Sequence, residues 1–212
     1  MKDIEGIPGL NIREENPKDH RTTEEVVREA FYNRYAPGAT EHYVLHLLRR
    51  EPGFEAWHSL VAEYEGQLIG QVLLSPARIL GNNGETHRMI ILGPVCCLNA
   101  VSGRGVGSAL MRAAIEKAKE RGERAIFLMG DPRYYRRFGF VPASRFGVHL
   151  PGMDENEEAA FFMALPLFSG ALEGVSGVFH ESRAFAQTEG FETYDSAFPP
   201  KQKMKLPGQL HG

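Results

Sequence analysis

The chain has 212 residues, of which 42% are hydrophobic and 24% charged, as in globular proteins of one domain or at most two small ones. Its formal net charge of −3 argues against general nucleic-acid binding, and no apolar run reaches the length of a membrane span. Residues 1–6 lack an apolar signal core, and two adjacent cysteines in a strand do not favour a disulfide. We therefore expect a cytoplasmic protein that binds neither nucleic acid nor membranes.

The N-terminal half predicts a strand, two helices and then three antiparallel strands. The expected segments are a strand at 10–13, helices at 19–31 and 41–50, and strands at 59–63, 68–74 with 77–80, and 88–98. Turns at Glu65-Gly66-Gln67 and Asn83-Gly84 join these strands as hairpins. Gly70, inside a predicted strand, indicates a bulge or a close approach by another group.

The C-terminal half begins with a predicted helix at 105–121 and a strand at 125–129. That strand is apolar on both faces, which is typical of a central parallel strand. A short helix is expected from Pro132 to about Gly139, and further strands are expected at 148–150, 160–165 and 175–179. The order predicts a mixed α/β sheet with one parallel crossover in its middle. Periodicity fades from about residue 186, which leaves a tail that is either held by contacts or mobile.

A glycine-rich turn, 103–107, joins the predicted strand 88–98 to the helix that follows. A helix N-terminus attracts phosphate, and glycines let a diphosphate approach the backbone. The dinucleotide fingerprint Gly-x-Gly-x-x-Gly/Ala does not fit from either Gly103 or Gly105, and no Gly-Lys-Ser/Thr is present. On spacing alone, the turn is either a phosphate loop or simply a tight connection.

The turn resembles the acyl-CoA loop of the GNAT N-acetyltransferase superfamily, Arg/Gln-x-x-Gly-x-Gly/Ala. A second segment, Tyr135-Arg136-Arg137-Phe138-Gly139-Phe140, is similar to that family's Tyr-x-x-x-Gly-Phe. Longer stretches around both motifs resemble a bacterial branch of predicted acetyltransferases. The resemblance implies a mostly antiparallel sheet of about seven strands, with a splayed parallel pair in its middle and about four helices. It implies one GNAT domain over residues 1–185 and a tail at 186–212.

The resemblance also implies acetyl-CoA as cosubstrate. Strand 95–98 would expose backbone groups to the pantetheine, and loop amides would hold the diphosphate. The implied cofactor-binding residues are Cys96, Cys97, Leu98, Arg104, Gly105, Val106, Gly107, Ser108 and Ala109. Arg104, Arg136 or Arg137 either adds charge to the phosphates or stays in solvent. Ser102 stands where the motif usually has Arg or Gln, so one side-chain contact to the diphosphate is replaced.

The implied reaction is direct attack of a primary amine, on a small molecule or a peptide, on the acetyl thioester. Tyr135 lies at the family's general-acid position, with Tyr134 as the competitor. The general base stays open among several side chains and a water chain. Those side chains are Glu63, Glu65, Asp131, His42, His46 and His87.

We expect no metal site. A covalent route through Cys96 or Cys97 lacks a His/Asp partner pattern. A homodimer is open, and the alternative to an enzyme is a non-catalytic acyl-CoA-binding or protein-interaction domain on the same fold.

Overall fold

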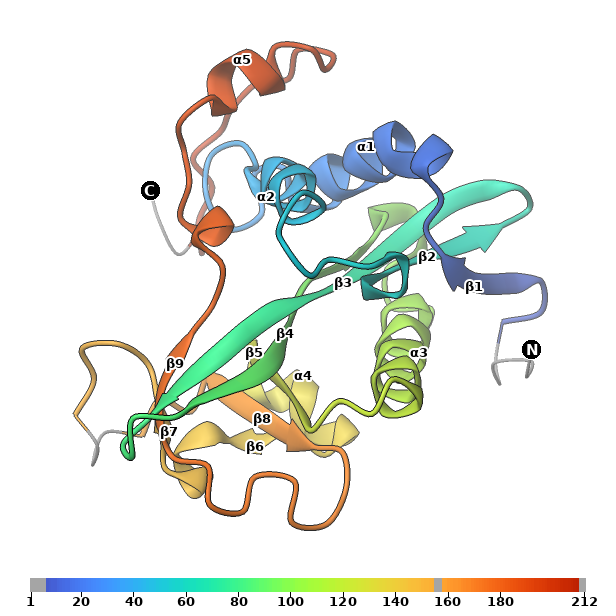
Figure 1. Ribbon diagram of the computed structural model, residues 1–212. Coiled ribbons are helices and arrows are strands. Elements are labelled where there is room, and N and C mark those ends of the chain that lie inside the picture. The colour runs from blue at the N-terminus through green and yellow to red at the C-terminus, as the bar shows by residue number, and fades with distance from the viewer. Residues whose placement is uncertain (1–6, 155–157, 210–212) are drawn as a thin grey trace. The chain divides into compact units, whose positions relative to one another are not determined.

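A computed structural model describes residues 7–154 and 158–209 (Figure 1). Residues 1–6, whose sequence lacks an apolar signal core, lie outside the described residues. The strands are β1 (Leu10–Glu14), β2 (Ser59–Tyr64), β3 (Gln67–Gly81), β4 (Thr86–Cys97), β5 (Ala125–Met129), β6 (Val141–Pro142), β7 (Val148–His149), β8 (Phe162–Pro166) and β9 (Gly177–His180). The α-helices are α1 (His20–Phe31), α2 (Glu41–Leu48), α3 (Val106–Glu120), α4 (Pro132–Tyr135) and α5 (Phe191–Asp195).

The strands form one mixed sheet, ordered β1-β2-β3-β4-β5-β8-β6, with β9 paired to both β3 and β7. β4 and β5 pair in parallel at Ile90–Ile126 and Ile91–Phe127, as the crossover through α3 predicts. β5 is apolar because both its faces are covered, and residues 125–128 are buried. A second parallel pair, β7 with β9, was not predicted, because two-residue ladders leave no periodic pattern in a sequence.

Gly70 permits a close approach between β3 and the end of β4. The β2–β3 register shifts after Ala62, which pairs with Gly70, while Glu63 pairs with Leu68. A Cβ at Gly70 would lie 2.8 Å from the Cys96 carbonyl oxygen and 3.1 Å from Leu110 Cδ1. Both expectations for Gly70, a bulge and a close approach, are therefore confirmed.

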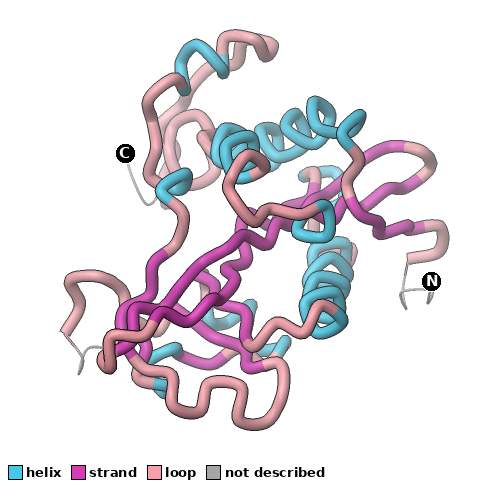
Figure 2. Tube along the Cα trace, viewed as in Figure 1, coloured by secondary structure: helices cyan, strands magenta, loops and turns pink. Residues whose placement is uncertain are grey.

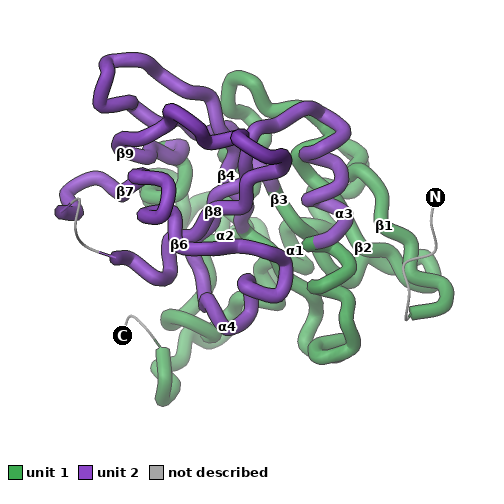
Figure 3. The backbone as a smooth tube through the Cα atoms, turned by 90° about the horizontal axis from the view of Figure 1, so that it is seen from below, with its two compact units in different colours: residues 1–73, 94–111, 183–212 green, residues 74–93, 112–182 purple. Residues whose placement is uncertain are grey.

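The chain divides into two compact units, each built from separated segments (Figure 3). Unit 1 comprises residues 1–73, 94–111 and 183–212, and unit 2 comprises residues 74–93 and 112–182. In unit 2, Phe127, Phe162 and Phe179 form an aromatic core, with ring centroids 4.8–5.8 Å apart. Long loops separate the short strands of this unit, including the connection from β8 to β9 (Figure 2).

The core of unit 1 is formed by α1 and α2 together with strands β3 and β4. Its central cluster takes Val27 and Ala30 from α1, and Val44, Leu45 and Leu48 from α2. These side chains recur at helical spacing and meet Leu73 of β3 and Cys96 of β4 in the same cluster. These contacts hold α2 against the end of β4, the strand that precedes the glycine turn.

The C-terminal segment, residues 183–209, packs on α1 and α2 and forms α5 beside α2 (Figure 1). Arg28 of α1, whose side chain is only 6% exposed, binds Asp195 of α5 through Nε at 2.7 Å and Nη2 at 3.3 Å. The fully buried His42 places Nε2 3.0 Å from the same carboxylate. Tyr43 donates to the Glu189 carbonyl, and Asn33 bonds to the backbone of Gln202 and Met204. The fading periodicity after residue 186 did not reveal these contacts, because they are made mainly by single side chains.

The described residues contain five α-helices and nine strands. The segments expected from the sequence were four helices and eight strands, and the family resemblance implied about four helices and about seven strands. Relative to the segments expected in chain order, the additional helix is α5 and the additional strand is β6, which has only two residues. Within residues 7–154 and 158–209, no helix combines the length and apolarity that a bilayer crossing requires.

Removal of the Asp195 carboxylate leaves the buried Arg28 guanidinium without its ion pair. We expect Asp195→Ala to lower the free energy of unfolding by about 3–5 kcal/mol, the usual cost of breaking a buried pair. Glu192→Ala is the matched control on α5, since that side chain is 84% exposed and its ion pair is with the exposed Lys203. Equal unfolding midpoints in urea for the two variants would contradict the structural role of Asp195.

His42 makes stability depend on pH. Burial, the largest cause, lowers the pKa of His42 to about 4, although the Asp195 charge opposes this. Between about pH 4 and 6.5, the unfolded chain binds a proton at His42 that the folded chain does not, so stability falls as pH falls through this window. The difference in the His42 pKa between the folded and unfolded chain corresponds to roughly 3 kcal/mol of stability, at about 1.36 kcal/mol per pKa unit. We expect His42→Gln to flatten the pH dependence of the free energy of unfolding in this range, and an unchanged slope would be inconsistent with a buried neutral His42.

Candidate active site

The glycine turn connects β4 to α3 within unit 1. After Cys97 the chain makes a 3-10 turn at Asn99–Val101 and then enters α3 at Val106. Gly103 and Gly105 have φ angles of +76° and +92°, which lie in the left-handed region that glycine adopts without strain. The glycines predicted to shape a phosphate loop therefore do have a conformational reason to be glycine.

The start of α3 presents backbone N–H groups to an exposed turn. The Arg104 N–H donates to Val101 O at 3.3 Å, and the Ala109 N–H closes the first helical turn onto Gly105 O at 2.9 Å. The N–H groups at the start of a helix have no partner within it, and the helix dipole adds positive potential there. Ser102, Gly103, Arg104 and Gly105 are exposed, and Gly107 and Ser108 are half-buried. The chemistry of this turn suits an anion such as a diphosphate.

The two thiols at the end of β4 are poor nucleophiles. Burial, with smaller contributions from the charges of Cys97 and Glu41, raises the pKa of Cys96 to about 12. Burial also raises the pKa of Cys97, although the Gly107 N–H donates to its sulfur and opposes this. Because the thiolate is the reactive form, these environments disfavour a covalent acyl-cysteine route.

Tyr135 is the last residue of α4 in unit 2, and its ring lies against the backbone of Gly130. A Cβ at Gly130 would lie 2.3 Å from Tyr135 Cε2, so only glycine admits the ring in this position. Tyr134 meets Tyr135 edge-on at 5.0 Å, and Phe140 lies 6.1 Å from Tyr135. Asp131 caps α4 by accepting the Arg133 N–H at 2.9 Å. The backbone and the neighbouring rings thus fix the position of the phenol.

Tyr134, the competing phenol, is half-buried on the same short helix. Its ring lies 5.5 Å from Phe138 and 4.6 Å from the Arg137 guanidinium. Arg137 also donates to the Tyr134 carbonyl, so this arginine is held on α4 and the following turn.

Ion pairs engage most of the side chains proposed as the general base. Glu63 accepts Arg13 Nε at 2.8 Å, and Asp131 binds Arg133, whose hydrogen bond lowers the pKa of that carboxyl. His42 is buried against Asp195, and His46 lies 3.2 Å from Glu24. Glu65 occupies the β2–β3 turn with φ +49°, and His87 lies 3.9 Å from Glu85. The candidate bases that form these pairs are therefore held in contacts that stabilise the fold.

Glu41, at the start of α2, was not among the candidate bases. Its carboxylate accepts the Thr40 N–H at 2.9 Å, and burial raises its pKa. The sequence holds a signal for it, because Glu41 precedes Val44, Leu45 and Leu48 at the spacing of one helix face. A carboxylate in line with an apolar stripe is unusual for a surface residue.

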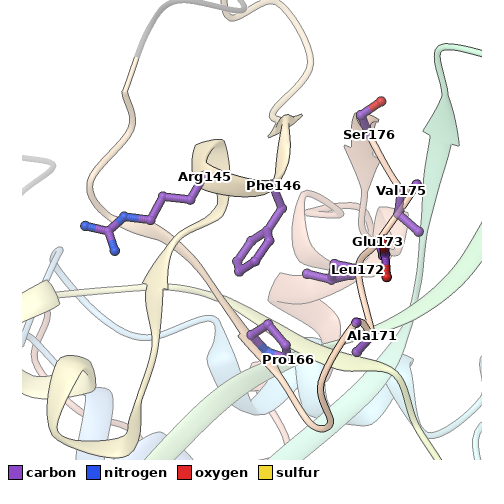
Figure 4. A pocket seen from close by; sticks show the side chains of 10 residues that line it. Arg145, Phe146, Pro166, Ala171, Leu172, Glu173, Val175 and Ser176 are labelled. Carbon is purple, nitrogen blue, oxygen red and sulfur yellow. The ribbon is translucent and has the colours of Figure 1, made fainter.

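Unit 2 also contains two hollows that involve other residues. The larger, about 500 Å³, is lined by Phe146, Pro166 and Leu172 together with the loop 170–176 (Figure 4). Phe146 and Leu172 point into the hollow, whereas the Arg145 side chain extends away from them (Figure 4). The second, about 380 Å³, is lined by Arg136, Gly139 and Phe140, among others. Neither hollow contains the predicted cofactor-binding residues or Tyr135.

The family model for the acetyltransferase (GNAT) domain matches residues 11–143, which include the glycine turn and Tyr135. The chain belongs to the GNAT acetyltransferase family. The sequence resemblance is thereby confirmed, as is the mixed fold with its parallel β4–β5 pair.

The chain is similar in sequence to two N-acetyltransferases of Escherichia coli. The uncharacterized N-acetyltransferase YhbS of Escherichia coli is 29% identical over 80% of this chain and 96% of its own length. A second Escherichia coli relative, the uncharacterized N-acetyltransferase YjhQ, is 36% identical over 41% of this chain, and the match spans about half (47%) of YjhQ.

Two solved GNAT structures cover nearly all of their own chains in the comparison. The structure of Escherichia coli YhbS in complex with CoA has a TM-score of 0.73 and 26% identity, over 88% of this chain and 97% of that one. A GNAT acetyltransferase from Brucella melitensis in complex with acetyl-CoA has a TM-score of 0.66 and 30% identity, over 83% of this chain and 97% of that one. Both relatives are acetyltransferases that carry CoA or its acetyl ester.

Packing of the Tyr135 ring on Gly130 gives a double-mutant test. We expect Gly130→Ala to lower the free energy of unfolding by about 1–3 kcal/mol, because the new methyl overlaps the ring. In a Tyr135→Ala background the overlapping atoms are gone, so the same Gly130→Ala change should have little effect. Equal costs in both backgrounds, measured by urea unfolding, would show that the ring does not lie against Gly130.

Proposed function

We propose that this GNAT enzyme transfers the acetyl group of acetyl-CoA to a primary amine by direct attack of the amine on the thioester. The observation that carries the proposal is the exposed turn at Gly103 and Gly105, which opens α3 directly after β4. Acetyl-CoA is the donor, consistent with the CoA and acetyl-CoA complexes of the two relatives. The acceptor is an amine on a small molecule or a peptide.

In this proposal the backbone binds the donor. Among residues 104–109, the N–H groups of Arg104 and Ala109 donate within the turn and that of Gly107 donates to the Cys97 sulfur. The N–H groups of Gly105, Val106 and Ser108 therefore hold the diphosphate, and Arg104 adds positive charge from its exposed position. The strand end at Cys96, Cys97 and Leu98 lies along the pantetheine. Because the Leu98 N–H donates to Ile69 O, the Cys97 N–H is the group that stabilises the developing oxyanion. These contacts need no particular side chain, so Ser102 in the first motif position is compatible with donor binding.

Tyr135 is the proposed general acid. The amine nitrogen forms a bond to the acetyl carbon, the carbon–sulfur bond breaks, and the phenol protonates the departing CoA thiolate. The proton that the nitrogen then loses restores the phenol, directly or through solvent. A phenol is protonated at neutral pH and serves as a donor there. Its position against Gly130 supports this role, because a fixed donor loses little freedom when it acts.

Tyr135→Phe removes the phenolic proton and keeps the ring that packs on Gly130. We expect kcat to fall by about 10²–10⁴, the usual contribution of a general acid, while the Kd of acetyl-CoA from calorimetry stays close to the wild-type value. Tyr134→Phe is the matched control on the same helix and should retain its activity. Wild-type turnover in Tyr135→Phe would remove Tyr135 from the mechanism.

The wild-type enzyme provides the test of the function itself. Release of CoA thiol is followed with acetyl-CoA and a panel of primary amines, together with the mass of the product. Acetylated amine in stoichiometric amount with free CoA is the expected result. Donor binding without turnover across the panel would instead support the non-catalytic alternative.

A further inference from the structure

The face of α2 that begins with Glu41 packs against the end of β4. Val44 and Leu45 lie three and four positions after Glu41, and residues at this spacing share one helix face. Both belong to the core cluster that contains Cys96 and Leu73. Glu41 is therefore the first residue of this helix face. One turn later, the same face contacts β4, the strand proposed to bind the thioester.

The charge of Glu41 acts on one of the two thiols at the end of β4. It makes a minor contribution to the raised pKa of Cys96, whose largest cause is burial, and Arg34 acts in the opposite direction on both thiols. Glu41 on α2 and Arg34 in the loop before it are therefore within electrostatic reach of this strand end. All of these residues belong to unit 1.

Glu41 differs from the other candidate carboxylates in its partners. Within residues 7–154 and 158–209 it makes no ion pair, and its carboxylate accepts only backbone N–H groups, those of Thr40 and of Glu41 itself. Glu63 and Asp131, by contrast, bind arginines. A half-buried carboxylate without a cation keeps its lone pairs available for a substrate proton.

We propose that Glu41 is the general base that deprotonates the acceptor amine. The inference rests on the acetyl transfer proposed above. The Glu41 carboxylate takes one proton from the acceptor ammonium, directly or through a water, and later returns it to solvent. The neutral amine then forms the carbon–nitrogen bond. The second nitrogen proton lost after that step balances the proton that the CoA sulfur receives.

The environment of Glu41 suits this task. Burial is the largest influence on Glu41 and raises its pKa towards the working pH, while the Thr40 and Glu41 N–H groups keep the ionised form accessible. A base is most effective when its pKa lies near the operating pH. A primary alkylamine, with a pKa of about 10.4, is protonated at neutral pH and needs such a base.

Glu41→Gln keeps the shape of the side chain and removes its basicity. With an alkylamine at pH 7, we expect kcat/KM to fall by about 10²–10⁴, with the Kd of CoA unchanged. Near pH 10, where much of the alkylamine is already neutral, the variant should approach wild-type activity. An arylamine that is neutral at pH 7 should show little difference between the variant and the wild type. Glu25→Gln is the control, an exposed helical carboxylate whose ion pair is with the exposed Arg21.

The outcomes separate this inference from the function on which it rests. A wild-type enzyme that acetylates no amine in the panel contradicts the proposed function. An active wild type with an equally active Glu41→Gln variant at pH 7 contradicts the role of Glu41 alone. An equal loss with both amines, persisting at pH 10, assigns Glu41 a structural role and also overturns the inference. A loss confined to the alkylamine and reversed at high pH supports it.

Discussion

The contact between Gly70 and the Cys96 carbonyl determines the position of the candidate donor site. Because Gly70 has no side chain, β3 approaches the end of β4 closely enough for the Leu98 N–H to donate to Ile69 O at 2.8 Å. That bond ends β4 at a defined residue, and the 3-10 turn and glycine turn follow from there. The bulge between β2 and β3 lies beside Gly70, the residue that permits this close approach.

The other side of Cys96 faces α2, so one strand end links the proposed donor and acceptor chemistry of unit 1. The thiols themselves serve as small buried side chains, and the raised pKa of each keeps it protonated. Without the thiols, the functional groups proposed at this strand end are the backbone of residues 96–98 and Glu41. In that proposal the peptide groups bind and polarise the thioester, and the carboxylate accepts a proton.

Local patterns in the sequence predicted most of the regular elements. α1 was expected at 19–31 and runs over His20–Phe31, because its apolar residues recur at helical spacing. β5 was expected and found at Ala125–Met129, since a run apolar on both faces fits few other places. The predicted role of Gly70 also came from a local rule, that glycine inside a strand marks a bulge or close contact. Family resemblance, rather than spacing, supplied Tyr135 and the meaning of the glycine turn.

The features that the sequence did not reveal depend on pairs of residues far apart in the chain. Asp195 binds Arg28 and His42, which are 167 and 153 positions away, and no local pattern encodes such a pairing. Glu41 was missed for a related reason. Among the described residues, Glu63 pairs with Arg13 whereas Glu41 makes no ion pair, and the Arg13–Glu63 pair depends on the β1–β2 register, which the apolar spacing of α2 does not show.

The short helix α2 makes long-range contacts in two directions, towards α5 and towards the end of β4. His42, Tyr43 and His46 lie towards α5, where the Tyr43 and His46 rings are 5.0 and 4.4 Å from Tyr194. Val44, Leu45 and Leu48 pack in one cluster with Cys96, and Glu41 precedes Val44 and Leu45 at the spacing of one helix face. A helix of eight residues has little intrinsic stability, so packing on both faces must hold it. The C-terminal segment thereby stabilises the helix on which Glu41 stands, and the buried Asp195 pairs contribute to the position of that carboxylate without touching it.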